Sequence, residues 1–156
     1  EKTDYVLVDC KDPEKFEEFQ LYARAFTRAA YAHIEGTSHL MRQMVLWAHD
    51  RGELHLSETE YTKLSGKYFN SFKDNLNLAF NHFTRLFGSA FRPNKNDPRY
   101  QSFLRGIEAR NSTMHPKTPA HFSMSGDAVR DIQLGFLWFS ETFRELLHSL
   151  SGVQEK

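Results

Sequence analysis

Residues 13–50, PEKFEEFQLYARAFTRAAYAHIEGTSHLMRQMVLWAHD, decide the fold class of this chain. Apolar side chains recur there at intervals of three and four residues, which predicts an amphipathic helix. Asp12 suits the cap of its first turn, and proline suits the first helical position. Three further apolar side chains continue the stripe toward its end: Leu40, Met44 and Trp47. We expect one long helix from about Pro13 to Asp50, straight or bent, with Gly36-Thr37-Ser38 as the place where it could kink or be interrupted.

Four more helical segments follow this one. Ser57 and Glu60 form a capping-box sequence, which predicts a short helix that ends at Gly66. Longer helices are expected over about 72–87, 97–114 and 126–150, because each range keeps apolar residues at helical spacing. Short connections between long helices favour antiparallel neighbours. The sequence therefore predicts an all-α fold, an antiparallel bundle of four long helices plus one short helix in a single domain over 1–156.

The charge of the chain is balanced overall but unevenly placed. Its 156 residues carry 20 basic and 20 acidic side chains, and 40% of the residues are hydrophobic, which is enough for a core. Residues 1–20 hold mostly acids, whereas residues 85–117 hold mostly bases. The basic segment suits an anionic substrate, although solvated helix faces account for it about as well.

Cys10 is the only cysteine, so no disulfide can form within one chain and a reducing, cytoplasmic location is expected. The chain has no signal peptide and no apolar run long enough to cross a membrane. It begins with Glu1 rather than methionine, as expected for a domain excised from a longer protein.

The side chains best suited to binding and catalysis lie in the hexapeptide Arg110-Asn111-Ser112-Thr113-Met114-His115, which Pro116 follows. Arginine offers a forked donor for phosphate, and histidine can move protons near neutral pH. A residue before proline is pushed out of the helical region, so the helix should end near Met114 and leave His115 able to turn toward Arg110. The segment from Arg28 to His33 has the same spacing, but His33 lies mid-helix on an apolar stripe and reads as structural.

The hexapeptide, late in a helical bundle and followed by one more long helix, resembles the motif of the HEPN (higher eukaryotes and prokaryotes nucleotide-binding) domain family. In that family an arginine is followed by a polar residue, a short spacer and a histidine. The resemblance implies a metal-independent endoribonuclease without a cofactor, often in a toxin or antiviral defence setting. It also implies a homodimer in which two motifs face one another, and in some relatives a regulatory partner protein or domain.

The resemblance assigns a role to each matching residue. Arg110 would hold the scissile phosphate and stabilise developing charge, with Asn111 positioning the phosphate or the imidazole. His115 would act as base on the ribose 2′-hydroxyl or as acid on the leaving oxygen, giving 2′,3′-cyclic phosphate ends. Arg105 and Lys117 are candidate substrate contacts. Lys117 stands where a toxin branch of the family has a tyrosine, so that branch's regulation by nucleotide attachment is not expected here.

Other interpretations stay open at this point. Arg110 could pair with Glu108 or an acid elsewhere, Asn111 could bond a neighbouring helix, and the domain could bind nucleotides or RNA, or dimerise, without catalysis. Metal catalysis finds little support, because the eight histidines lack the three- or four-residue spacing of helical ligand pairs. Glu145 and His148 are three apart, but no second copy completes a di-iron site.

Overall fold

The computed structural model describes residues 12–67, 70–114 and 123–151, and every regular element within these ranges is a helix. The five helices are α1 (Pro13–Asp50), α2 (Glu58–Leu64), α3 (Phe72–Leu86), α4 (Pro98–Met114) and α5 (Gly126–Ser151). The predicted all-α class and the order of the helices along the chain are therefore confirmed. Cys10, His115 and Lys117 lie outside the described residues.

The long first helix forms because both its start and its buried face are encoded locally. The Asp12 side chain accepts a hydrogen bond of 3.1 Å from the Glu14 amide, and Pro13 takes the first helical position. α1 continues through Gly36-Thr37-Ser38 without interruption, so the prediction of one long helix from about Pro13 to Asp50 is confirmed. Ser38 is buried and donates to the Asn75 carbonyl of α3, so this segment is fixed by packing rather than released from the helix.

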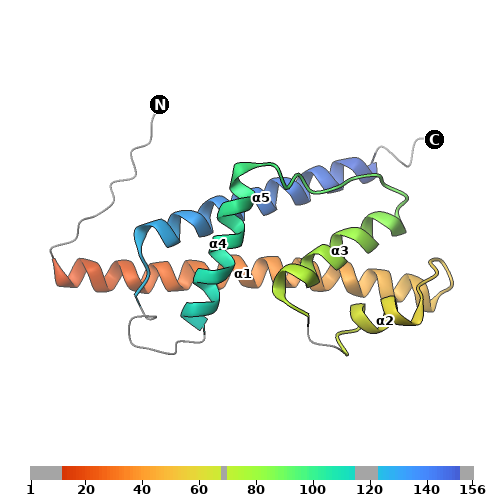
Figure 1. Ribbon diagram of the computed structural model, residues 1–156, viewed down its shortest axis with the longest axis horizontal. Coiled ribbons are helices and arrows are strands. Elements are labelled where there is room, and N and C mark those ends of the chain that lie inside the picture. The colour runs from red at the N-terminus through yellow and green to blue at the C-terminus, as the bar shows by residue number, and fades with distance from the viewer. Residues whose placement is uncertain (1–11, 68–69, 115–122, 152–156) are drawn as a thin grey trace.

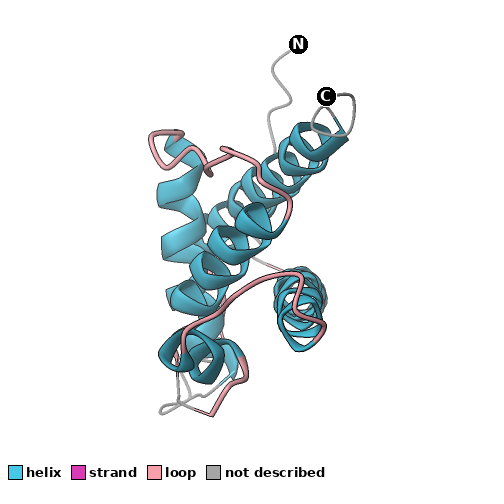
Figure 2. Ribbon diagram, turned by 90° about the vertical axis from the view of Figure 1, so that its right-hand side faces the viewer, coloured by secondary structure: helices cyan, strands magenta, loops and turns pink. Residues whose placement is uncertain are grey.

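Figure 1 shows α1 running along the length of the molecule, with α5 above it and α4 crossing α1 steeply. α4 packs mainly against α5, and α1 packs mainly against α3. Seen along the molecule in Figure 2, α1 appears end-on at one side, α4 stands on the other side, and α5 runs obliquely above α1. The C-terminal end of α4 therefore reaches α1, and this places Arg110 against the long helix.

The core is aromatic where α4 meets α5. The Trp138 ring of α5 lies 4.8 Å from that of Tyr100 and 4.9 Å from that of Phe103, and its indole nitrogen donates to the Asn94 carbonyl. Ion pairs flank this contact, since Arg99 near the start of α4 lies 2.7 Å from Glu141 of α5. The aromatic contacts and the ion pair together fix the direction in which α4 leaves α5.

The end of the apolar stripe of α1 is not covered by the other described helices. Its last three side chains are largely exposed: Leu40 at 65%, Met44 at 47% and Trp47 at 58%. The buried face in this half of α1 consists instead of Met41, Val45, Leu46 and Ala48. α1 therefore carries two apolar faces, and the spacing of apolar residues did not distinguish the one that the other helices cover.

Gly135 of α5 allows the close approach of α4. A Cβ atom added at Gly135 would lie 2.6 Å from the Cα atom of Phe103, a backbone position that cannot turn aside. At Gly36 of α1, by contrast, nothing lies within 4 Å of an added Cβ atom. The two glycines thus stand in helices for different reasons, and only the first is needed for packing within the domain.

Gly135→Ala should lower the free energy of unfolding by about 1–3 kcal/mol, because α4 must shift to admit the methyl group. Gly36→Ala is the matched control and should raise it by about 0.5–1 kcal/mol, since alanine is the better helix former. Urea unfolding at low protein concentration measures both. Equal stabilisation by the two substitutions would contradict the close packing at Gly135.

Candidate functional site at the end of helix α4

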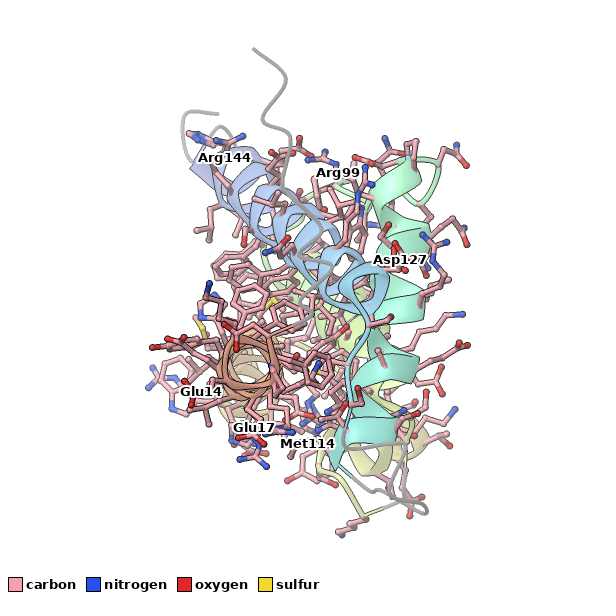
Figure 3. The ribbon with its side chains drawn as sticks, turned by 90° about the vertical axis from the view of Figure 1, so that its left-hand side faces the viewer. Glu14, Glu17, Arg99, Met114, Asp127 and Arg144 are labelled. Atoms are coloured by element: carbon pink, nitrogen blue, oxygen red, sulfur yellow. The ribbon has the colours of Figure 1, made fainter. Side chains whose placement is uncertain are left out.

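α4 is described as far as Met114, and residues 115–122 lie outside the described residues, so a helix end set by the proline at position 116 stays a prediction. Figure 3 looks along α1 and shows Met114 near the level of that helix, whereas Arg99 lies toward the opposite end of α4. Arg110 and Asn111 lie near the C-terminal end of α4, and Met114 is the last of its described residues. The first two residues of the predicted site are therefore presented together, whereas the third lies outside the described residues.

Arg110 is held by an acid from the long helix. Its Nη2 atom lies 2.7 Å from Oε1 of Glu35, and its Nη1 atom donates to Oδ1 of Asn111 at 3.0 Å. The guanidinium also lies over the Phe72 ring, 5.8 Å from its centre. The Arg110 side chain is only 19% exposed, whereas that of Glu35 is 49% exposed. Arg110 is thus oriented by three neighbours and remains open to solvent on the side of Glu35.

Glu35 is the residue that sequence reasoning missed. An acid pairing with Arg110 was among the interpretations left open, but Glu108 was the only one named, and Glu35 lies 75 positions away in the chain. No local pattern marks Glu35, because acidic residues on an exposed helix face are common. Asn111 is exposed, and its side-chain oxygen accepts its hydrogen bond from Arg110 rather than from a neighbouring helix.

A buried tyrosine lies close to this site. Tyr31 of α1 is 3% exposed, and a Cβ atom added at Gly106 of α4 would come within 2.5 Å of its hydroxyl oxygen. Burial raises the pKa of Tyr31 above its usual range, and the nearby charge of Arg110 opposes that shift only in part. The phenol therefore stays neutral at physiological pH, and the Tyr31 side chain packs between α1 and α4 near Gly106.

Arg105, the other described candidate for substrate contact, is not brought to Arg110. Its Nε and Nη2 atoms bind the two carboxylate oxygens of Asp131 on α5 at 2.8 and 2.7 Å, and Nη2 also donates to the Ser102 hydroxyl. This bidentate pair raises the pKa of Arg105 and lowers that of Asp131. Arg105 therefore links α4 to α5.

The histidines do not assemble a second site in the described part of the chain. His33 packs edge-on against Phe136 and Phe139 of α5, which fits its structural interpretation. No group of three histidine, cysteine or acidic side chains suited to a metal ion occurs among the described residues. His82 of α3 is the one with a shifted pKa, which burial lowers although the charge of Glu60 opposes the shift.

Comparison with known proteins assigns nothing further: no family model, curated protein or solved structure matches the chain. No described helix is both long enough and apolar enough to cross a membrane. The side chains around Arg110 and the sequence that follows them are therefore the features that bear on function.

The resemblance of the hexapeptide implies RNA binding, and on that expectation Glu35→Gln should tighten the binding of single-stranded RNA roughly three- to tenfold, about 1 kcal/mol, because it removes the negative charge that competes with phosphate for Arg110. Fluorescence anisotropy in a His115→Ala background measures binding without cleavage. Glu108→Gln removes an equal charge from the exposed face of α4 and is the control. Equal affinities for the two variants would mean that RNA does not reach Arg110.

His82 should make the fold sensitive to acid. Its pKa in the folded protein lies below the unfolded value of about 6.5, so the unfolded chain takes up the proton first as the pH falls. The contribution of neutral His82 to the free energy of unfolding is complete when the pH is above the unfolded pKa, and it is lost progressively as the pH falls below it. His82→Phe should flatten the decline in thermal stability between neutral and mildly acidic pH; an unchanged decline would assign it to other groups.

Proposed function

We propose that this chain is a HEPN-like helical bundle that cleaves RNA without a metal ion, by attack of a ribose 2′-hydroxyl on the adjacent phosphate. The observation that carries the proposal is the oriented pair of Arg110 and Asn111 near the C-terminal end of α4, a few residues before His115 in the sequence. A toxin or antiviral defence setting, as in the family that the motif resembles, is part of the same proposal.

The arrangement around Arg110 suits a phosphate. A guanidinium has five N–H donors, and the contacts to Glu35 and Asn111 use one each of Nη2 and Nη1. The remaining donors can engage phosphate oxygens as charge develops on them. Because Glu35 and Phe72 fix the guanidinium before substrate binds, little side-chain freedom is lost on binding.

The chemistry proposed for His115 is a proton transfer at each end of the reaction. As base, the imidazole takes the proton from the 2′-hydroxyl while the new bond to phosphorus forms. As acid, a protonated imidazole gives a proton to the 5′-oxygen while its bond to phosphorus breaks. No water is consumed, so the products are a 2′,3′-cyclic phosphate and a 5′-hydroxyl. DNA lacks the attacking group and is not a substrate.

A non-catalytic module that binds RNA or dimerises is the second candidate. The observation in its favour is the Arg110–Glu35 pair itself, since an arginine already neutralised by a carboxylate is a weaker phosphate ligand than a lone arginine. Under this alternative, RNA binds without being cut, and the residue at position 115 has no effect on the RNA.

End-labelled RNA incubated with the protein in EDTA should be cut, leaving cyclic phosphate ends. His115→Ala and Arg110→Ala should each reduce cleavage by a factor of about 10²–10⁴, the usual contribution of a positioned acid–base or charge-stabilising group. Arg144→Gln is the control, because it removes an exposed positive charge from α5, away from the site. A substrate with 2′-deoxyribose at the cleaved position should stay intact.

Equal cleavage by the parent and His115→Ala would overturn the proposed mechanism. Intact RNA with every protein, together with RNA binding that Arg110→Ala weakens, would support the second candidate instead. Circular dichroism of each variant separates loss of activity from loss of fold. Arg110→Ala removes a pair that is half-exposed on the Glu35 side, so most of its stability should remain.

A further inference from the structure

Arg42 of α1 is a half-buried arginine whose charge is not paired. Its Nη1 atom donates to Oδ1 of Asn75 on α3 at 3.1 Å. Its Nε atom is enclosed and has no acceptor, and no acid of the described residues lies within ion-pair distance of the guanidinium. A half-buried cation with an unmet donor is costly, and an anion at its open side would offset that cost.

Other arginines that join two helices do so through a carboxylate. These pairs are Arg85 with Glu60, Arg99 with Glu141, Arg105 with Asp131 and Arg110 with Glu35. Arg42 joins α1 to α3 through an amide instead, and an amide supplies an acceptor but no negative charge. The contact therefore fixes the direction of the Arg42 guanidinium and leaves its positive charge available to a ligand.

Asn75 is itself held in place on α3. Its side-chain oxygen also accepts from the Asn70 amide at 3.4 Å, and its own amide donates to the Asn70 carbonyl at 3.5 Å. Its backbone carbonyl accepts from the buried Ser38 hydroxyl of α1 at 3.4 Å. The Asn70 amide donates in addition to the Lys63 carbonyl near the end of α2 at 3.2 Å. A polar network that joins α1, α2 and α3 therefore orients Arg42 before any ligand binds.

Arg42 and Arg110 lie on one side of α1. Arg42 is seven residues beyond Glu35, which binds Arg110, so the two α1 residues share a face and stand about 10 Å apart along the helix. Phe72, at the start of α3, lies under the Arg110 guanidinium. Asn75, three residues further along α3, binds Arg42. Figure 1 shows the start of α3 and the C-terminal end of α4 on the same side of α1, so the first turn of α3 bridges the two guanidinium groups.

We propose that Arg42 is a second phosphate contact for single-stranded RNA, and that the strand runs from Arg110 to Arg42 over the first turn of α3. The inference rests on the proposed function, because the strand that it places is the RNA to be cut. At a rise of about 3.4 Å per nucleotide in a stacked strand, 10 Å corresponds to roughly three nucleotides. Such a contact fixes the register and orientation of the strand without reading its bases.

The chain around this contact is basic. Residues 63–75 carry three exposed lysines, Lys63, Lys67 and Lys73, against one acid, Asp74. Asp74 is engaged at the start of α3, where its Oδ2 atom accepts from the Ser71 hydroxyl at 2.6 Å. Flexible lysines attract phosphates as point charges, whereas a fixed guanidinium presents donors in a set direction. The lysines therefore add general attraction around the one oriented contact at Arg42.

Fluorescence anisotropy in a His115→Ala background measures the affinity for single-stranded RNA without cleavage. Arg42→Gln should weaken binding about tenfold at low salt, and it should reduce the slope of log affinity against log salt by about 0.7, the value for one lost phosphate contact. A purely structural role of Arg42 would leave that slope unchanged. Single-stranded DNA of the same sequence should show the same losses, because it has the same backbone phosphates.

Asn75→Asp tests the site without removing a donor. The new carboxylate would stand where the amide oxygen now accepts from Arg42, so it should pair with the guanidinium, keep the domain folded and weaken RNA binding as Arg42→Gln does. Asn81→Asp is the matched control, since it adds the same charge at an exposed position of α3. In the active protein, Asn75→Asp should raise KM about tenfold with kcat nearly unchanged, because the reacting phosphate lies at Arg110.

RNA binding that Arg110→Ala weakens and Arg42→Gln does not would refute this path and leave the proposed nuclease standing. Equal weakening by Asn75→Asp and Asn81→Asp would refute it as well, because only net charge would then matter. Binding that depends on Arg42, to RNA that the active protein leaves intact, would support the path and refute the cleavage. Circular dichroism checks the fold of each variant, and Asn75→Asp decides the question if Arg42→Gln does not fold.

Discussion

α4 and α5 approach so closely at Gly135 that an added methyl group there would lie 2.6 Å from the backbone of Phe103. This contact lets the aromatic rings of Tyr100, Phe103 and Trp138 pack together, and the Arg99–Glu141 pair lies at one end of it. α4 therefore crosses α1 (Figure 1), and Arg110 near its C-terminal end contacts Glu35. The geometry of the candidate site thus depends on a packing contact on another part of α4.

The site itself combines a local and a distant contribution. Arg110 and Asn111 are adjacent in sequence, and their hydrogen bond needs only the helix that carries both. Glu35 comes from the middle of α1, and it changes the electrostatic character of the site, because a lone arginine attracts phosphate more strongly than one held in an ion pair. The ion pair with Glu35 also fixes the direction of the guanidinium before any ligand binds.

The two apolar faces of α1 have separate consequences. One face closes the core against α3 and α5, and burial of its side chains stabilises the domain. The other remains exposed along almost the whole helix, which is costly for an isolated protein because such strips promote association.

The sequence by itself determined where two helices begin, through the caps at Asp12 and Ser57. These features depend on a few neighbouring residues, so local chemistry specifies them. The tertiary structure alone decided that Leu40, Met44 and Trp47 stay exposed, that Arg105 binds Asp131, and that Glu35 reaches Arg110. Helical spacing shows which residues share a face, but the direction of the neighbouring helices determines which face is covered and which distant charges meet.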